Sequence, residues 1–279
     1  MRIPLVNKFT CNENQLASTI KILRKANLLP ILDYTNENFK NHKKNFNKIS
    51  QLINHHPNNL IAVKLSSLDI VNSPKRSEDY LHKLTELAIN VNSKILIDAE
   101  NFLVQDEINN ISTKFMKEYN TKKVNIYKTY QMYRTDNLNI LKSDFLQPRN
   151  YFIGCKLVRG AYYNQDYKYN ILFDKIEDTH YNYDSALTFF SKNNKLNDNL
   201  ICATHNENSI DLAVDLIKNN QLNNIEFAHL MGMSDKLSNK LAKNYVTYKY
   251  LPFGNFKDTL PYLIRRLYEN YPMISKLLK

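Results

Sequence analysis

Short apolar stretches alternate along the chain with longer stretches in which apolar residues recur at helical spacing. The helical patterns include Asp79–Val91, Gln105–Tyr119, Asn208–Asn219 and Ser234–Asn244. The eight short stretches are Leu28–Asp33, Leu60–Leu65, Lys94–Asp98, Val124–Tyr130, Phe152–Val158, Leu200–Thr204, Ile225–Leu230 and Val246–Leu251. This alternation, without a Pro/Gly-rich linker, is typical of parallel strands that are buried on both faces and joined by helices.

Eight strand–helix repeats in a chain of 279 residues favour a closed barrel over an open doubly wound sheet, because barrels of this kind form one domain of roughly 250 residues. We therefore expect an α/β fold, a (β/α)8 TIM barrel, as a single domain over residues 1–279. A helical pattern over Glu13–Ala26 predicts an extra N-terminal helix before the first strand. A second pattern after Pro261 predicts a C-terminal helix over the barrel mouth.

Composition narrows the class of function. The formal charge is +11, from 38 Lys and Arg against 27 Asp and Glu. The lysines are scattered and form no basic block interleaved with aromatic residues, so we expect no nucleic-acid partner. A basic surface also suits peripheral association with a negatively charged membrane surface. With only four glycines and no G-x-G-x-x-G, the chain carries no dinucleotide-binding fingerprint.

The cysteines and the N-terminus bear on the compartment. Cys11, Cys155 and Cys202 are widely spaced and match neither a disulfide framework nor a metal site, so we expect a reducing compartment and no metal. Cys155 and Cys202 lie in apolar stretches and are expected in the core. No run of about 18 apolar residues occurs, and Met1–Pro4 begins neither a signal peptide nor a transit peptide. We expect a soluble or peripherally attached protein.

Polar residues stand where the predicted strands end, which in a parallel barrel is the end that carries the site. Lys64 lies inside an apolar stretch, and Asp98 ends the next one. A buried lysine is costly unless it is paired, and Asp98 is its natural counter-ion. Further polar or aromatic residues end the other strands: Gln131, Lys156, Arg159, Tyr162, Tyr163, Thr204, His205, Asn206 and Tyr250.

Each of these residues also has a purely structural interpretation. Asp98 could cap a helix, Gln131 could be a satisfied core amide, and His205 could belong to an ordinary polar loop. Lys64 also fits a Schiff-base lysine, as in barrel aldolases. Convergent polar groups at six strand ends favour a functional site.

A segment near the C-terminus contains a candidate anion-binding site. If Pro261 opens a helix, then Tyr262, Arg265, Arg266 and Glu269 share one face. Two adjacent guanidinium groups can bind a carboxylate or phosphate through paired hydrogen bonds. A solvent-exposed Arg–Glu helix pair is the alternative.

Several motifs occur together and in order. They are Asp98-Ala99-Glu100, Thr129-Tyr130-Gln131, Lys156-Leu157-Val158-Arg159-Gly160-Ala161-Tyr162, Ala203-Thr204-His205-Asn206, Leu230-Met231-Gly232-Met233, Tyr250-x-Pro252-x-Gly254, and Tyr262-Leu263-x-Arg265-Arg266-x-x-Glu269-Asn270. From about Leu32 to its end, the chain closely resembles the proline dehydrogenase family. The resemblance implies a barrel that binds FAD and oxidises L-proline to Δ1-pyrroline-5-carboxylate by hydride transfer from C5 to flavin N5. It also implies a quinone electron acceptor, and a catalytic barrel without a fused aldehyde dehydrogenase.

The resemblance also implies roles for individual residues. The implied catalytic residues are Lys64, Asp98 and Lys156. The implied substrate contacts are Lys64, Tyr162, Leu230, Tyr250, Tyr262, Arg265 and Arg266, with the arginine pair on the proline carboxylate. The implied FAD contacts are Asp98, Ala99, Gln131, Lys156, Val158, Gly160, Ala161, Tyr163, Thr204, His205, Asn206 and Glu269. Glu37 matches a glutamate that gates the site by pairing with an active-site arginine.

This chain departs from common members of the family at three positions. Lys156 replaces an arginine, which keeps the positive charge but loses the planar fork. Tyr163 replaces a tryptophan, and His229 stands where glutamine is common. A flavin-free barrel that serves as a binding protein and a Lys64 Schiff-base lyase remain alternatives, and proline is not distinguished from hydroxyproline. Eukaryotic members are mitochondrial inner-membrane proteins. We therefore expect a location in the cytoplasm or peripherally on the inner membrane, which would be the mitochondrial one if the chain is eukaryotic.

Overall fold

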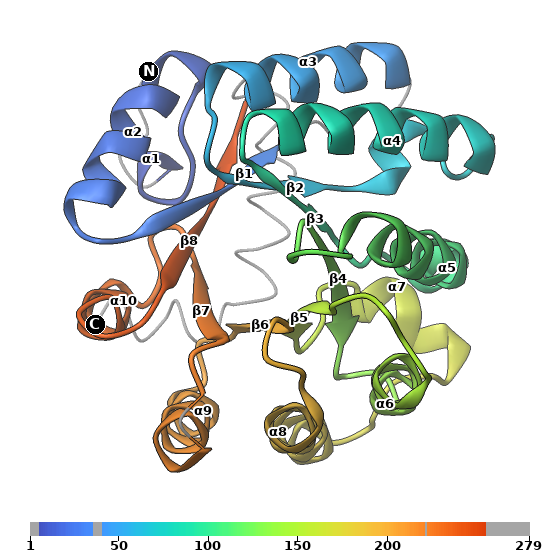
Figure 1. The fold of residues 1–279 in the computed structure, drawn as a ribbon, viewed down its shortest axis with the longest axis vertical. Helices are drawn as coiled ribbons and strands as arrows, with labels where there is room; N and C mark the ends of the chain where they lie inside the picture. Colours follow the sequence, from blue (N-terminus) through green and yellow to red (C-terminus); the bar gives the residue numbers. More distant parts are fainter. Residues whose placement is uncertain (1–5, 36–40, 221, 255–279) are drawn as a thin grey trace.

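The strands of the chain close into one barrel. The computed structural model describes residues 6–35, 41–220 and 222–254. All neighbouring strands are parallel and follow the sequence order, and β8 pairs with β1 to close the ring (Figure 1). The strands are β1 (Leu29–Tyr34), β2 (Leu60–Val63), β3 (Lys94–Ile97), β4 (Ile126–Gln131), β5 (Gly154–Val158), β6 (Asn199–Ala203), β7 (Ile225–Leu230) and β8 (Thr247–Phe253). The expected (β/α)8 fold is confirmed.

Helices surround the strands on the outside (Figure 1). They are α1 (Val6–Phe9), α2 (Glu13–Lys25), α3 (His42–His55), α4 (Pro74–Asn90), α5 (Phe102–Tyr119), α6 (Asn137–Leu146), α7 (Tyr163–Asp166), α8 (Ile176–Asn193), α9 (Glu207–Asn220) and α10 (Asp235–Leu241), with short 3-10 turns η1 (Leu65–Leu68) and η2 (Tyr167–Tyr169). The expected leading helix is α2, and Asn12 caps it by accepting a hydrogen bond from the Gln15 backbone. The predicted C-terminal helix lies outside the described residues, so it and the single-domain boundaries stay predictions.

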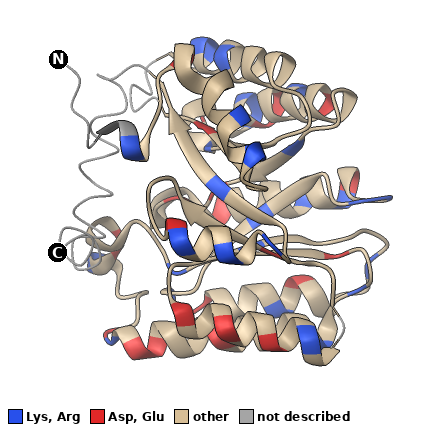
Figure 2. Ribbon diagram, turned by 90° about the vertical axis from the view of Figure 1, so that its left-hand side faces the viewer, with Lys and Arg blue, Asp and Glu red and all other residues tan. Residues whose placement is uncertain are grey.

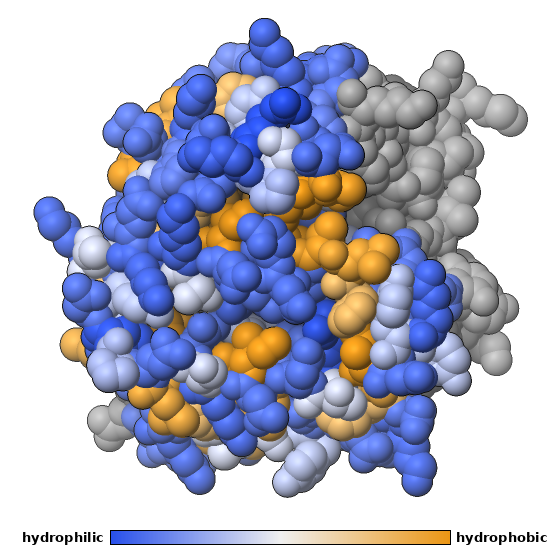
Figure 3. Space-filling model, turned by 90° about the vertical axis from the view of Figure 1, so that its right-hand side faces the viewer, coloured by the Kyte–Doolittle hydropathy of each residue, from blue (hydrophilic) through white to orange (hydrophobic). Residues whose placement is uncertain are grey.

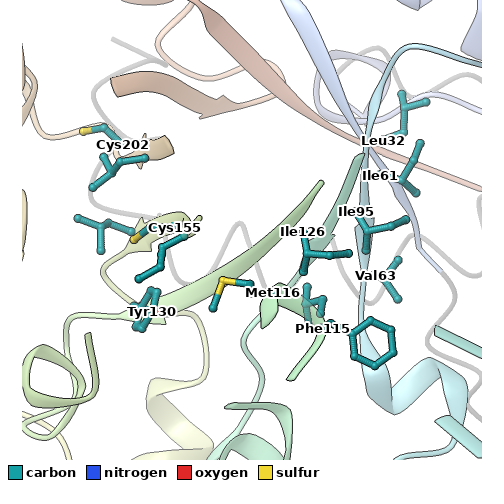
Figure 4. Packing of buried hydrophobic residues seen from close by; sticks show 14 of the residues in the cluster. Leu32, Ile61, Val63, Ile95, Phe115, Met116, Ile126, Tyr130, Cys155 and Cys202 are labelled. Atoms are coloured by element: carbon teal, nitrogen blue, oxygen red, sulfur yellow. The ribbon is translucent and has the colours of Figure 1, made fainter. Parts of the chain in front are cut away.

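Strand side chains alternate between two packed layers. One layer fills the barrel interior and includes Ile31, Leu60, Ala62, Leu96, Tyr127, Ile201, Ala228 and Tyr248. The other packs against the helices and includes Leu32, Ile61, Val63, Ile95, Ile126, Tyr130, Cys155 and Cys202, beside Phe115 and Met116 of α5 (Figure 4). Burial on both faces explains why the strands appear in the sequence as continuous apolar stretches. Cys155 and Cys202 are buried free thiols, as expected.

Toward the carboxyl ends of the strands, the side chains that face the barrel interior become polar. Ile31 and Asp33 are two residues apart, as are Ala62 and Lys64, so each pair points to the same side of its strand. The same relation links Leu96 to Asp98, Tyr248 to Tyr250, and Ala228 to Leu230. Because all strands run in one direction, these side chains gather at the carboxyl end of the barrel interior.

The described surface is mixed in character. Lys, Arg, Asp and Glu residues are interspersed over the outer helices in Figure 2, so positive charge is spread out on that face. Apolar residues show as separate patches between hydrophilic residues in Figure 3. Within the described ranges, no helix combines the length and the hydropathy needed to cross a membrane.

Candidate active site

A cavity of about 430 Å³ lies at the carboxyl ends of the strands. Its lining comes from most strands of the barrel, together with the loops that follow them. The predicted site residues that line it are Lys64, Asp98, Ala99, Gln131, Lys156, Val158, Gly160, Ala161, Tyr162, Thr204, His205, Asn206, Leu230 and Tyr250. The structure therefore brings together residues from widely separated motifs.

A charged cluster forms one side of this cavity. Lys64 Nζ lies 2.7 Å from Asp33 Oδ1 and 3.6 Å from Asp98 Oδ2. Lys156 Nζ donates to Asp98 Oδ1 at 2.7 Å, and the Tyr250 hydroxyl donates to Asp98 Oδ2 at 2.6 Å. Lys156 Nζ also lies 5.0 Å from the centre of the Tyr250 ring. The expected pairing of Lys64 with Asp98 is present, but the closer carboxylate is Asp33, for which no role was expected.

Asp98 is ionised within this cluster. Burial alone would raise its pKa, but the charges of Lys156 and Lys64 and the hydrogen bonds from Lys156 and Tyr250 lower the pKa below its usual value. One buried carboxylate thus lies between two ammonium groups and the Tyr250 phenol. Removal of that carboxylate would leave the two ammonium groups without the anion that lies between them.

The buried carboxylate of Glu100, in the loop that follows β3, links this loop to the loop that follows β2. Glu100 accepts hydrogen bonds from the backbone N–H of Ser66 at 2.9 Å and from the Ser66 hydroxyl. Burial raises the pKa of Glu100, and the bonds from Ser66 offset this only in part. Gln131 Nε2 donates to the Glu100 carbonyl at 2.9 Å, and the Gln105 side chain accepts from the Glu100 N–H at 2.7 Å. The loops after β2, β3 and β4 are therefore held in one arrangement, which positions Lys64 and Asp98.

Arg159 presents a positive charge on another side of the cavity. Its guanidinium donates to His180 Nδ1 at 2.9 Å, Thr204 Oγ1 at 2.5 Å and Ser209 Oγ at 2.9 Å. The group also lies 4.5 Å from the centre of the Tyr183 ring. In the part of the chain that the structure describes, no carboxylate lies within ion-pair distance of it. A partly buried cation with only neutral partners suits an anionic group of a ligand.

Two histidines lie side by side at the ends of β6 and β7. The ring centres of His205 and His229 are 5.4 Å apart. His205 Nδ1 lies 2.9 Å from Ser234 Oγ, and His229 Nδ1 lies 3.0 Å from Ser238 Oγ. Burial lowers the pKa of His205 to about 4 and that of His229 to about 3. Both rings are therefore neutral near pH 7.

Gly160 shapes the wall next to Arg159. Its φ of +148° is a backbone conformation that other residues rarely adopt. A Cβ atom at this position would lie 2.3 Å from the ring of Tyr133. That ring is fixed, because the Tyr133 hydroxyl donates to the buried Asp166 at 2.7 Å. Only glycine fits at position 160.

Some predicted residues are not at the cavity. Tyr163 begins α7, is 47% exposed and packs against Tyr167, with ring centres 5.5 Å apart. It does not line the described cavity. The remaining predicted residues lie outside the described ranges: Glu37, Tyr262, Arg265, Arg266 and Glu269.

The structure adds residues for which the sequence predicted no role. Asp33 ends β1 with the same alternation as Asp98, which is a signal that the sequence did contain. Arg159 stood inside a quoted motif. His180 lies in the second turn of α8 and carried no sequence signal. His229 was noted only as an unusual residue and now lines the cavity.

A closed parallel barrel with ionisable groups around a cavity at its carboxyl end defines the class of (β/α)8-barrel proteins whose sites lie at that end. The family model for proline dehydrogenase matches residues 16–278. The chain belongs to the proline dehydrogenase family.

Curated relatives agree with this membership. Proline dehydrogenase 1, mitochondrial, of Dictyostelium discoideum is 37% identical over 214 residues, which cover 70% of this chain and 37% of that protein. The Caenorhabditis elegans protein of the same name is 34% identical over 212 residues, covering 69% and 34%. Hydroxyproline dehydrogenase of Xenopus laevis is 32% identical over 204 residues, covering 67% and 44%. The matched part is thus less than half the length of each relative.

Solved structures support the fold. Proline utilization A (PutA) from Bdellovibrio bacteriovorus, inactivated by N-propargylglycine, matches with a TM-score of 0.88 at 18% identity, over 96% of this chain and 33% of that one. PutA from Corynebacterium freiburgense matches with a TM-score of 0.82 at 17% identity, over 97% and 31%. The same barrel is therefore shared at low sequence identity.

Proposed function

We propose that this chain oxidises L-proline to Δ1-pyrroline-5-carboxylate with FAD as its cofactor. The observation that carries the proposal is the cluster of Lys64, Asp98, Lys156 and Tyr250 at the cavity of a chain that belongs to the proline dehydrogenase family. The cluster offers positive charge and an aromatic surface together, which suits a small ring that bears a carboxylate.

The residues of the cavity fit FAD. Arg159 supplies a cation without a carboxylate partner among the described residues, which suits the negative charge of a pyrophosphate. Further contacts would come from Gln131, Lys156, Val158, Gly160, Ala161, Thr204, His205 and Asn206, all of which line the cavity. When bound, FAD accepts the hydride that leaves C5 of proline and passes the electrons on to an acceptor, for which we propose a quinone.

The chain's own task is to bind and orient proline. We propose that Lys64 attracts the proline carboxylate, together with Arg265 and Arg266. Leu230 and Tyr250 belong to the apolar interior layer and would pack against the ring. Asp98 keeps Lys156 in place, so a positive charge faces the ligand from β5. That charge stabilises negative charge that develops next to it.

The surroundings of Lys64 disfavour a Schiff-base lyase. An amine must be unprotonated to attack a carbonyl. Lys64 Nζ lies between Asp33 and Asp98, and both carboxylates favour its protonated form. The flavin-free binding barrel is left as the rival proposal, and the first experiment below separates the two.

The first experiment is the visible spectrum of the purified full chain, reconstituted with FAD, before and after anaerobic addition of L-proline. The proposal predicts a flavin band that bleaches with proline and regains its colour when a soluble quinone is added. A chain that binds no FAD would leave only a binding barrel. A bound flavin that proline does not bleach would reject the substrate.

The arginine pair has a separate test. We expect Arg266→Met to raise KM for proline strongly, by about 100-fold if it removes a bidentate carboxylate contact, while FAD stays bound. Loss of FAD from this variant would reject the role given to Arg266. The matched variant Arg76→Met removes an arginine whose partner, Asp69, does not line the cavity, and it should leave KM unchanged.

The electron acceptor and the cellular location of the protein belong to the same proposal. A quinone is apolar and resides in membranes, and a basic chain suits peripheral contact with an anionic membrane surface. We therefore propose peripheral membrane association. Sedimentation with vesicles that contain anionic lipid, at low and at high salt, would measure this.

A further inference from the structure

Asp33 is a buried carboxylate next to the cavity that does not itself line it. The residue is 1% exposed and lies near the end of β1, whereas Lys64 and Asp98 line the cavity. Asp33 Oδ1 lies 2.7 Å from Lys64 Nζ, closer than Asp98 Oδ2 at 3.6 Å. In the described ranges, Lys64 is the one partner of the Asp33 side chain, because Asp33 Oδ2 is buried without a hydrogen bond. The contact between Asp33 and the cavity therefore passes through Lys64.

A comparison with Asp198 shows what Asp33 lacks. Asp198 pairs with an arginine and also accepts the backbone N–H groups of Ile153 and Lys195, so its carboxylate holds chain segments together. Asp33 accepts no backbone N–H group within the part of the chain that the structure describes. A buried ion pair without such bonds contributes little net stability, because the desolvation of both charges offsets their attraction. Stability alone thus gives no reason for a carboxylate at position 33.

The backbone around Asp33 is fixed on both sides. β1 pairs with β2 and with β8, and Asp33 takes part in both pairings. Two residues further on, the backbone N–H and the hydroxyl of Thr35 both donate to the Phe253 carbonyl at 3.0 Å. Lys64 follows β2 and carries its ammonium group on a long, flexible side chain. A rigidly held carboxylate thus limits the positions that this ammonium group takes up.

Asp33 and Asp98 divide the ammonium groups between them. Asp98 accepts from Lys156 Nζ at 2.7 Å and from the Tyr250 hydroxyl at 2.6 Å. Lys64 Nζ donates to Asp33 instead and stays 3.6 Å from Asp98 Oδ2. Without the charge of Asp33, the nearest carboxylate oxygen for Lys64 is the one that already accepts from Tyr250. Lys64 would then move toward Asp98 and away from its place beside Asp33.

We propose that Asp33 is a positioning residue that holds the Lys64 ammonium group where it contacts the carboxylate of the substrate. The inference rests on the proposed function, because it takes L-proline as the substrate. The negative charge of Asp33 also opposes an anionic ligand, but the cavity wall is formed by Lys64, whose positive charge lies closer to the ligand. Positioning is therefore the larger effect, and loss of Asp33 weakens proline binding.

The first test is KM for L-proline in the reconstituted full chain. Asn at position 33 keeps the shape of the side chain but removes the charge that attracts Lys64. We expect Asp33→Asn to raise KM about tenfold while kcat stays within about threefold, because the Lys64 contact serves the ground state and the transition state alike. The matched control is Asp144→Asn, which removes the carboxylate of another Lys–Asp pair, also 2.7 Å long, outside the cavity. The control should leave KM unchanged, and an unchanged or lower KM in Asp33→Asn would overturn the inference.

A double-mutant cycle tests whether Asp33 acts through Lys64. Lys64→Met removes the ammonium group and keeps a flexible side chain of similar length. In that background, Asp33→Asn should change KM by less than about twofold, because no ammonium group is left to position. A further rise of about tenfold in the double variant would mean that Asp33 acts on the site by another route, and the inference would then be wrong.

Urea unfolding of the same variants, without FAD or substrate, gives a second cycle. Lys64→Met leaves Asp33 buried without its cation, which is unfavourable. The double variant with Asp33→Asn removes that isolated charge and should therefore be more stable than Lys64→Met alone. Equal stability of the two variants would contradict the pairing on which the inference depends.

The outcomes separate the inference from the function on which it rests. If the original chain does not oxidise L-proline, the proposed function fails, and the role of Asp33 in proline binding fails with it. If the original chain oxidises L-proline and Asp33→Asn does so with the same KM, only the inference fails. The unfolding cycle tests the contact between Asp33 and Lys64 whichever of these results is obtained.

Discussion

The phenol of Tyr250 donates a 2.6 Å hydrogen bond to Asp98, although 152 positions separate the two residues in the sequence. Tyr250 lies in β8 and Asp98 directly follows β3, so the bond links β8 to β3 at the carboxyl end of the barrel. It also orients the carboxylate that binds Lys156. The charged cluster is therefore a product of barrel closure, and changes within it have predictable effects.

Substitution of Asp98 should separate catalysis from stability. We expect Asp98→Asn to lower kcat/KM for proline by about 100-fold, because Lys64 and Lys156 lose the carboxylate between them. Asp144→Asn is the matched control, since it breaks the buried Lys128–Asp144 pair, 2.7 Å long, on the helix side of β4. The control should lose about 3 kcal/mol of unfolding free energy and keep its kcat. Steady-state kinetics would contradict the role of Asp98 if its variant behaved like the control.

If FAD binds as proposed, the charge of Lys156 should tune its reduction potential. Lys156→Met removes a cation from the cavity wall, so we expect a more negative flavin midpoint potential and flavin reduction by proline that is about 100-fold slower. Lys156→Arg keeps the charge and should stay within about tenfold of the original rate. Anaerobic stopped-flow and dye-linked potentiometry measure both quantities. An unchanged potential in the Met variant would show that Lys156 acts only through Asp98.

Two histidines should make the fold sensitive to acid. The pKa values of His205 and His229, about 4 and about 3, lie below the usual value of 6.5. Between pH 6.5 and those values the unfolded chain binds more protons, so stability falls as the pH falls. From pH 6.5 to pH 5 each ring should lower the unfolding free energy by about 2 kcal/mol. Urea unfolding at both pH values should show a smaller difference for His229→Gln, and an equal difference would refute its contribution.

The buried ion pair between Arg149 and Asp198, at the amino-terminal end of the barrel, should stabilise the fold without affecting proline binding. Asp198 pairs with Arg149 and accepts the N–H groups of Ile153 at 2.8 Å and Lys195 at 2.7 Å. Both charged side chains are almost fully buried. We expect Asp198→Asn to lose about 3–5 kcal/mol of unfolding free energy, measured in urea. KM for proline, measured at low temperature where the variant is folded, should not change; a raised KM would place this pair among the site's supports.

The strands were predictable from the sequence because each is buried on both faces. The start of α4 was harder to predict, because the apolar periodicity begins near Asp79 whereas the helix begins at Pro74. Ser73 caps it by accepting the Arg76 N–H, and a proline is favoured at the first helical position. The cap residues carried this information, and the apolar pattern did not.

The candidate site was predictable where a charged residue interrupts an apolar stretch, as Lys64 and Asp98 do. The Lys64–Asp33 contact was not, because it depends on the register that sets Asp33 opposite Ala62. Arg159 and His180 meet only because α8 packs beside β5, and the sequence contains no sign of that contact. The contact of His229 Nδ1 with Ser238 Oγ, 3.0 Å away, joins β7 to α10, so only the folded chain specifies it.

Closure of the barrel through β1 and β8 also bears on biosynthesis. β1 is made first, and its partner strand is among the last described elements to be made. Until that strand arrives, β1 and β7 both carry unpaired edges, and such edges recruit other chains. Closure must also overcome the chain entropy of joining strands that are far apart in sequence. A nascent or shortened chain that ends before Thr247 would therefore tend to self-associate as well as lack Tyr250.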